Sequence, residues 1–169
     1  MNIFSIAQKL YSPLDKVALS NHPVLFNIML TTLCEDHGVS TSKISPLHRA
    51  VRLGLEEAVE SLLQFGSDPN EKNSLGEIPL HVAVRMNRID LVRILLPYSH
   101  INATSHYGLT PLHWACLFGY TPIVELLLLN GADPYIHAVE ADGLTPRDFA
   151  MLMGQKEVIN LIENFAPLR

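Results

Sequence analysis

The chain has few of the features that mark membrane proteins or secreted proteins. Its longest strongly apolar run, Ile123 to Leu129, contains Glu125 and is far shorter than the roughly 20 residues that a membrane-spanning helix needs. The amino terminus lacks the basic-then-apolar order of a secretory signal. Two cysteines, Cys34 and Cys116, are too few for a disulfide framework. We therefore expect a cytoplasmic protein without membrane partners, with the nucleus or the cytosol of a host cell as alternatives.

Basic residues are also scarce. The chain has 12 Lys and Arg against 17 Asp and Glu, and its net charge of −5 repels phosphate backbones. Nucleic acid is therefore not expected as a partner. The 169 residues, 48% of them apolar, are enough for one domain with a sizeable core, and no low-complexity tract divides them.

What the chain does contain is a short block that returns at a nearly constant spacing. The block occurs as SPLHRA at residues 45–50, IPLHVA at 78–83, TPLHWA at 110–115 and TPRDFA at 145–150. Its prolines are 33, 32 and 35 residues apart. A second apolar cluster follows each block at a matching distance, namely Val59, Leu62 and Leu63, then Val92, Leu95 and Leu96, then Val124, Leu127 and Leu128, and finally Val158, Leu161 and Ile162. Such a period predicts a solenoid of stacked units.

A weaker copy of the block lies nearer the amino terminus. Ser12 to Val17 lies 33 residues before the first clear block, with Asp15 in place of the histidine. Ahead of it, apolar residues from Ile3 to Leu10 keep a helical period. We expect residues 1–43 to form a helix and a diverged capping repeat. They would be continuous, as a single domain, with four repeats in 44–169, at about 44–75, 76–107, 108–140 and 141–169.

The block, the glycine after its helix, the V-x-x-L-L cluster and the G-A-D-P turn resemble the ankyrin repeat. The resemblance is clear over residues 45–165 and weak from residue 12. It implies an all-α solenoid of antiparallel helix pairs whose loops extend as β-hairpin fingers. The residues support this fold independently, because Pro suits a first helical turn behind a Ser or Thr cap, and Gly54, Gly119 and Gly154 suit a helix end.

Histidine and cysteine lie three residues apart at His113 and Cys116, a pairing that suggests a nucleophile and its base or half a metal site. His48, His81 and His113 recur with the period, however, which favours a structural role. In the ankyrin family this imidazole bonds backbone groups that link adjacent fingers. Cys116 aligns with Val51, Val84 and Met151, which predicts a core contact. Cys34 and His37 have no second pair to complete a zinc site. No catalytic residue, metal ligand or cofactor is expected, so the chain is not expected to be an enzyme.

Function is therefore expected on the surface of the stack. In ankyrin-like arrays the partner usually meets the concave side, formed by the finger tips and the ends of the first helices. The positions that this resemblance implies are unusually apolar. They are Arg52, Leu53, Leu75, Arg85, Met86, His106, Tyr107, Leu109, Trp114, Leu117, Phe118, Leu152 and Met153. Exposed apolar area of this extent usually marks a binding site, although packing between repeats is the alternative.

The charged and apolar members of this set lie at different ends. Arg52 and Arg85 lie toward the amino half and are expected to pair with carboxylates or to stack on an aromatic ring. Met86, Tyr107 and Phe118 are the expected apolar anchors. The partner predicted by this arrangement is a protein segment with bulky apolar anchors and acidic residues.

Two further expectations concern loops. Pro97 should end the second helix of the middle repeat early, and the last finger, at residues 137–143, is two residues longer and offers a second contact site. Asn70 and Asn102 occupy turns where ankyrin-like proteins are hydroxylated by an asparaginyl oxygenase, although Asn is also a good turn former.

Members of the resembling family are adaptors, targeting subunits, inhibitors and, in intracellular bacteria and viruses, effectors that grip host proteins. The resemblance thus predicts a monomeric, non-enzymatic interaction module, acting as an adaptor, targeting factor or stoichiometric inhibitor. Three alternatives remain open: a structural protein that self-associates through its apolar concave face, a pathogen effector that grips a host protein, and an enzyme whose chemistry would have to lie within the first 43 residues.

Overall fold

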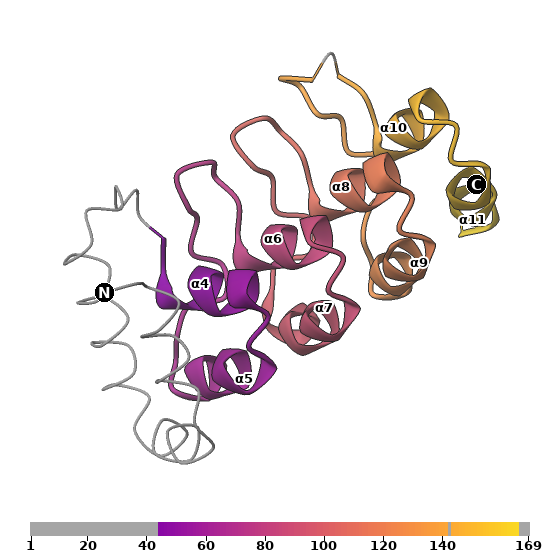
Figure 1. Ribbon diagram of the computed structural model, residues 1–169. Coiled ribbons are helices and arrows are strands. Elements are labelled where there is room, and N and C mark those ends of the chain that lie inside the picture. Colours follow the sequence, from indigo (N-terminus) through magenta and orange to yellow (C-terminus); the bar gives the residue numbers. More distant parts are fainter. Residues whose placement is uncertain (1–43, 142, 166–169) are drawn as a thin grey trace, which may run out of the picture.

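The computed structural model describes residues 44–141 and 143–165, which form four antiparallel helix pairs in a row (Figure 1). The pairs are α4 (Pro46–Leu53) with α5 (Glu56–Gln64), α6 (Pro79–Arg85) with α7 (Ile89–Leu95), α8 (Pro111–Phe118) with α9 (Thr121–Leu129), and α10 (Pro146–Leu152) with α11 (Lys156–Phe165). The predicted all-α solenoid is confirmed. The predicted amino-terminal helix and diverged repeat, together with Cys34 and His37, lie outside the described residues.

The first helix of each pair begins and ends where the sequence block predicts. The helices start on a proline, and the side-chain oxygens of Ser45, Thr110 and Thr145 accept hydrogen bonds from backbone N–H groups three residues later. α4 ends at Gly54, which has a left-handed φ of 71°. In the second pair the same place is taken by Asn87, also left-handed at φ 54°. The tight turn between paired helices therefore depends on this one conformation.

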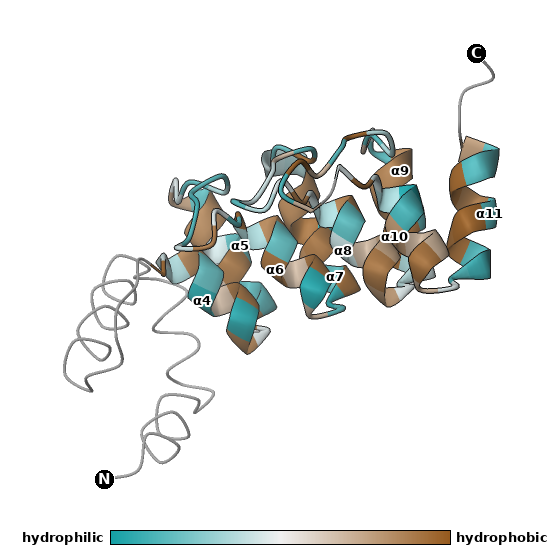
Figure 2. Ribbon diagram, turned by 90° about the horizontal axis from the view of Figure 1, so that it is seen from above, coloured by the Kyte–Doolittle hydropathy of each residue, from teal (hydrophilic) through white to brown (hydrophobic). Residues whose placement is uncertain are grey.

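Neighbouring pairs share one elongated core. α6 packs against both α4 and α8, α8 packs against α10, and the second helices follow in a parallel row. Several helices show both brown and teal in Figure 2, since the side facing another helix is the more apolar one, whereas α8 and α9 are apolar around most of their circumference. The buried leucines recur with the repeat, at Leu47, Leu80 and Leu112 in first helices and at Leu62, Leu95 and Leu127 in second helices. No single pair covers its own apolar surface, so stability comes from stacking.

The stack departs from the regular repeat at two places, the end of α7 and the position of Met151. α7 ends at Leu95 after seven residues and continues as a short 3₁₀ helix, η1 (Leu96–Tyr98), so the early stop expected at Pro97 is confirmed. The core contact predicted for Cys116 is confirmed, since it is buried like the aligned Val51 and Val84, but the aligned Met151 is exposed. No described helix pair packs beyond α10 and α11 to cover Met151.

The loops between pairs extend as fingers from one side of the row (Figure 1). An equivalent backbone hydrogen bond closes each finger, with the N–H of Asn73, Ser105 and Ala138 donating to the carbonyl oxygen of Glu77, Leu109 and Leu144, respectively. Across residues 44–141 and 143–165 regular strands are absent, and Ala138 with Leu144 forms an isolated antiparallel bridge. The hairpin turns expected from the family therefore form, but their arms are too short for a β-ladder.

The three repeated histidines fasten each first helix to the next finger. Nε2 of His48, His81 and His113 lies 2.8, 3.0 and 3.2 Å from the carbonyl oxygens of Glu77, Leu109 and Leu144, respectively. In His81, Nδ1 accepts the backbone N–H of Ile78 at 3.3 Å, so the proton must be on Nε2, which donates to Leu109. Burial lowers the pKa of His81 to about 4 and lowers those of His48 and His113, which keeps these rings neutral near pH 7. The predicted structural role is confirmed.

Candidate interaction surface

The last turns of the four first helices form a row of side chains on one side of the stack. We call this row the helix-end surface; its members are Arg52, Leu53, Arg85, Met86, Leu117, Phe118, Leu152 and Met153. All are exposed except Leu117, which is half-buried. Met86, Phe118 and Met153 are 43%, 42% and 55% exposed, and their helices are neighbours in the stack. Packing between repeats therefore leaves a large part of each of these apolar side chains in contact with water.

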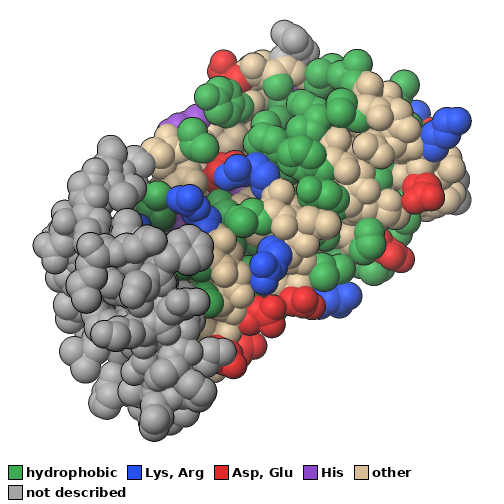
Figure 3. Space-filling model, viewed as in Figure 1, with side chains coloured by type: hydrophobic (Ala, Val, Ile, Leu, Met, Phe, Trp, Pro, Cys, Tyr) green, Lys and Arg blue, Asp and Glu red, His purple; other side chains and the backbone are tan. Residues whose placement is uncertain are grey.

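An aromatic stack lies at the centre of the helix-end surface. The rings of Trp114 and Phe118 stack with centroids 5.8 Å apart and an interplanar angle of 10°, and Phe118 stacks on Tyr120 at 5.4 Å. Trp114, predicted at this surface, is half-buried. In Figure 3, hydrophobic atoms gather over the region of α8, with Lys or Arg atoms toward α4 and α6. The stack gives the surface a flat, stiff apolar centre.

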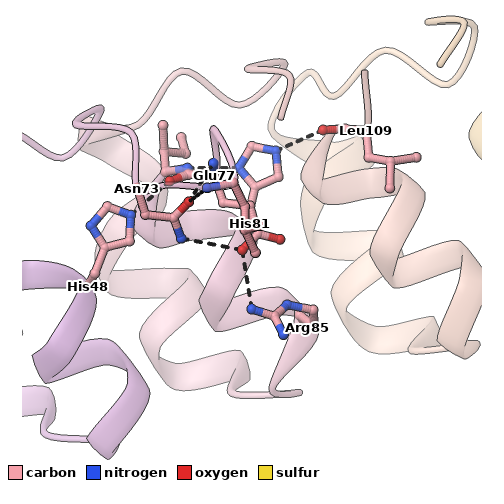
Figure 4. A network of polar contacts seen from close by, with 8 residues as sticks. His48, Asn73, Glu77, His81, Arg85 and Leu109 are labelled. Atoms are coloured by element: carbon pink, nitrogen blue, oxygen red, sulfur yellow. Dashed lines mark hydrogen bonds and ion pairs between the residues drawn. The ribbon is translucent and has the colours of Figure 1, made fainter. Parts of the chain in front are cut away.

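Arg85 is already paired within the chain. Its Nη2 lies 3.2 Å from Oε2 of Glu77, whose side chain is only 3% exposed (Figure 4). The Arg85 guanidinium carbon also lies 5.9 Å from the centre of the Trp114 ring. The sequence predicted that Arg85 would pair with a carboxylate or stack on an aromatic ring, and it does both, but with residues of its own chain. Pairing with a partner's carboxylate is therefore no longer the role that we assign to it.

Glu77 was missed by sequence reasoning. It stands two residues before the repeated proline, where the other three described repeats have Ile44, Leu109 and Leu144. The signal was present, because a charged residue at an otherwise apolar repeat position needs a partner when it is buried. The side chain that meets this need lies eight residues further on, at Arg85.

The finger tips add a second group of exposed side chains. Leu75, His106 and Tyr107 are exposed, and the backbone N–H of His106 donates to the carbonyl oxygen of Leu75 at 2.9 Å, which joins two fingers. Leu109 was predicted at this surface, but it is buried. It lies on the returning arm of its finger, where the His81 bond to its carbonyl oxygen holds it against the stack. Leu109 is therefore removed from the candidate site.

Charges differ between the two helices of the first pair. α4 carries Arg49 and Arg52 and no acidic residue, α6 carries Arg85, and α8 has no charged residue. α5, behind α4, carries three glutamates and no basic residue. The first-helix side of the amino-terminal pairs is thus basic even though the chain as a whole is acidic. A segment lying along the helix-end surface would meet positive charge at one end and apolar side chains at the other.

Exposed apolar residues also occur at the far ends of the second helices. Phe65, Tyr98 and Leu129 are all exposed there, and Phe65 and Tyr98 occupy equivalent positions, 19 residues after the repeated proline. These residues were not predicted. They stand singly at successive helix ends, whereas the rings around Phe118 contact one another.

Nucleophilic chemistry at Cys116 is disfavoured by its surroundings. The side chain is fully buried, and burial raises its pKa to about 12, so the reactive thiolate is scarce at neutral pH. Within residues 44–141 and 143–165, no group of three or more His, Cys, Asp or Glu side chains is placed to hold a metal ion. In the same residues, no helix has both the length and the apolar character to cross a membrane.

Asn70 and Asn102 each bridge two consecutive loops. Oδ1 of Asn70 accepts the backbone N–H of His100 at 2.6 Å, and its Nδ2 donates to the carbonyl oxygen of Tyr98 at 3.2 Å. Asn102 makes the equivalent bonds to Asp133 and Gly131 at 2.9 and 3.4 Å. These bonds give both asparagines a structural role. Their hydroxylation stays a prediction.

Comparison with known proteins agrees with the repeat geometry. A family model described as ankyrin repeats (three copies) matches residues 47–138 and 107–166, which together cover more than half of the chain. The chain belongs to the ankyrin-repeat family. The four described helix pairs, their proline-led first helices and their histidine-linked fingers are the structural form of this match.

Curated relatives of this ankyrin-repeat chain match it over part of their length. NF-kappa-B inhibitor alpha of Homo sapiens is 40% identical over 96 residues, which are 53% of this chain and 30% of the relative. Rabankyrin-5 of Homo sapiens is 36% identical over 86 residues, 50% of this chain and 7% of the relative. Transient receptor potential cation channel subfamily A member 1 of Homo sapiens is 32% identical over 120 residues, 69% of this chain and 11% of the relative. The chain thus spans less than a third of each of these relatives.

Proposed function

We propose that this ankyrin-repeat chain is a non-enzymatic module that binds a segment of another protein along the helix-end surface and the neighbouring finger tips. The observation that carries the proposal is the row of exposed Met86, Phe118 and Met153 beside the stacked rings of Trp114 and Tyr120. Aromatic and thioether side chains at the centre of a surface supply much of the contact energy of protein interfaces.

The chemistry of the proposed partner follows from the division of charge. Acidic residues of the segment would lie near Arg52 on α4, and bulky apolar residues would lie on Phe118 and its neighbours. The net charge of −5 makes nucleic acid a poor alternative.

As an adaptor, a targeting factor or a stoichiometric inhibitor, the chain would act as a monomer, and we place it in the cytoplasm. If the partner belongs to a host, the same surface would serve a pathogen effector.

The test uses a random dodecapeptide display library selected on the intact chain. Peptides that bind the unchanged protein should lose binding to Phe118→Glu by at least about tenfold, since a hot-spot side chain contributes more than ~1.4 kcal/mol. The matched control is Phe65→Glu, which places the same charge at an exposed phenylalanine on a second helix and should leave binding unchanged.

Circular dichroism and the melting temperature must stay close to those of the unchanged protein in both variants. Peptides that bind Phe118→Glu as well as the parent, or that are lost from Phe65→Glu instead, would contradict the proposed surface. Unfolding of Phe118→Glu would show that its ring serves packing between repeats.

A further inference from the structure

The repeat provides a comparison that isolates one unusual residue, Glu77. Arg52 and Arg85 are equivalent, each six residues after its proline. Two residues before the proline, the repeat of Arg52 has Ile44 and the repeat of Arg85 has Glu77. Two arginines of the same surface therefore have different neighbours, one apolar and one acidic.

The surroundings of Glu77 show what the acidic residue does. Its carboxylate is buried and accepts Nη2 of Arg85 at 3.2 Å and Nδ2 of Asn73 at 3.5 Å (Figure 4). The backbone of Glu77 is separately engaged, since its N–H donates to Oδ1 of Asn73 and its carbonyl oxygen accepts Nε2 of His48. Replacing the side chain therefore leaves the backbone hydrogen bonds of Glu77 in place and removes only the contacts of its carboxylate.

Arg85 links the carboxylate of its own repeat to the indole of the next. Its guanidinium lies over the Trp114 ring at 5.9 Å, and its side chain is 39% exposed. An acidic group from a partner that took Arg85 would leave the Glu77 carboxylate buried without its cation, which is strongly unfavourable. Arg85 thus lies over the Trp114 ring with its charge balanced by the buried Glu77 carboxylate.

We propose that Glu77 is a specificity-determining residue of the helix-end surface. By neutralising Arg85 and holding it over Trp114, Glu77 makes the centre of the surface select an aromatic or aliphatic anchor and disfavour an acidic residue there. Arg52, whose repeat has Ile44 at the matching place, recruits the acidic residues of the partner segment. This inference rests on the proposed function, because it concerns the chemistry of the same surface.

The test repeats the dodecapeptide selection on Glu77→Leu, a change that gives this repeat the residue found at Leu109 and Leu144. Peptides selected on the unchanged chain should carry an aromatic or aliphatic anchor without an acidic residue beside it. Peptides selected on Glu77→Leu should gain Asp or Glu beside the anchor. A peptide of the second kind should bind Glu77→Leu up to about fivefold more tightly than the parent, the upper end of the range for one exposed ion pair.

Glu77→Gln keeps the shape of the side chain and removes its charge, so it should show the same change in selected peptides even if the leucine variant folds poorly.

Trp114 is the one tryptophan of the chain, so its fluorescence reports the position of Arg85 directly. Without peptide, both variants should change the Trp114 emission while retaining the circular dichroism of the parent. Unchanged emission would overturn the positioning role of Glu77.

The results of these selections distinguish a failure of the Glu77 proposal from a failure of the proposed binding function. If selected peptides are lost from Phe118→Glu but have the same composition on the parent and on both Glu77 variants, the surface stands and the role of Glu77 is wrong. If no selected peptide depends on Phe118, the proposed function has itself failed, and the inference fails with it.

Discussion

At the scale of single residues, the repeat shows which positions are fixed by geometry. The residue that ends the first helix must be left-handed in every described pair. Three pairs use glycine, at Gly54, Gly119 and Gly154, with φ between 68° and 71°, whereas the second pair uses Asn87 at φ 54°. A side chain makes this left-handed conformation unfavourable, although asparagine adopts it more readily than most non-glycine residues.

Asn87→Gly is therefore expected to stabilise the protein. Removing the left-handed strain should outweigh the extra freedom of glycine in the unfolded chain, for a gain of about 0.5–1 kcal/mol in the free energy of unfolding. Urea unfolding followed by circular dichroism measures this gain. The reverse change, Gly119→Asn, should lower the free energy of unfolding by a comparable amount. If Asn87→Gly is instead less stable than the parent, the asparagine side chain contributes to the turn.

At the scale of elements, the junction between a first helix and the next finger depends on a neutral histidine. His81 illustrates it best, because both ring nitrogens are engaged and burial lowers its pKa to about 4 from its ordinary value of 6.5. The unfolded chain therefore takes up a proton on this ring at a higher pH than the folded chain does. Stability present above pH 6.5 is lost as the pH falls toward 4.

We expect the free energy of unfolding to fall by about 2 kcal/mol between pH 7 and pH 5 through His81 alone, with His48 and His113 adding to the loss. Urea midpoints at the two pH values measure this. His81→Gln should reduce the pH dependence, while His100→Gln, at an exposed histidine, should preserve it. An equal pH dependence in all three proteins would contradict the role of burial.

The two preceding examples also show how far the sequence alone reaches. Proline-led helices and glycine turns were predictable because each recurs with the period and depends on local geometry. The structural role of His48, His81 and His113 was predictable from their recurrence, whereas their bonds to the next finger were implied by the family resemblance. The orientation of Leu109 and the pairing of Arg85 with Glu77 were not, because they depend on how a finger folds back onto its own helix. Met151 is exposed although its aligned residues are buried. Burial at this position needs a further helix pair packed against it, and the repeat pattern does not say which pairs have such a neighbour.

At the scale of the whole molecule, the first helices present arginines and stacked rings, whereas the second helix of the first pair is acidic. First helices α4 and α6 supply the arginines and α8 supplies the stacked rings, whereas α5 supplies three glutamates. Two copies that met through the same helix-end surface would bring Arg52 of each into the shared interface, while Arg85 of each would stay paired with its own Glu77. The helix-end surface offers no acidic residue to pair with Arg52 of a second copy, which favours a different polypeptide as the occupant.

A concentration series checks this preference. Sedimentation equilibrium should give a mass close to 18.8 kDa that stays constant as protein concentration rises, because the helix-end surface offers no acidic residue to pair with Arg52 of a second copy. A mass that climbs toward twice this value in the parent but not in Phe118→Glu would favour the alternative of self-assembly through this surface.

The most direct test of the account uses the methyl groups of methionine, of which the chain has five. Met86 and Met153 lie on the helix-end surface, while Met151 is exposed at the end of the stack and serves as an internal control. Methyl-labelled protein should be titrated with a dodecapeptide selected on the intact chain and followed by NMR. We predict that the Met86 and Met153 signals shift to saturation together while Met151 stays in place. A peptide that shifts Met151 but leaves Met86 and Met153 unchanged would contradict the account.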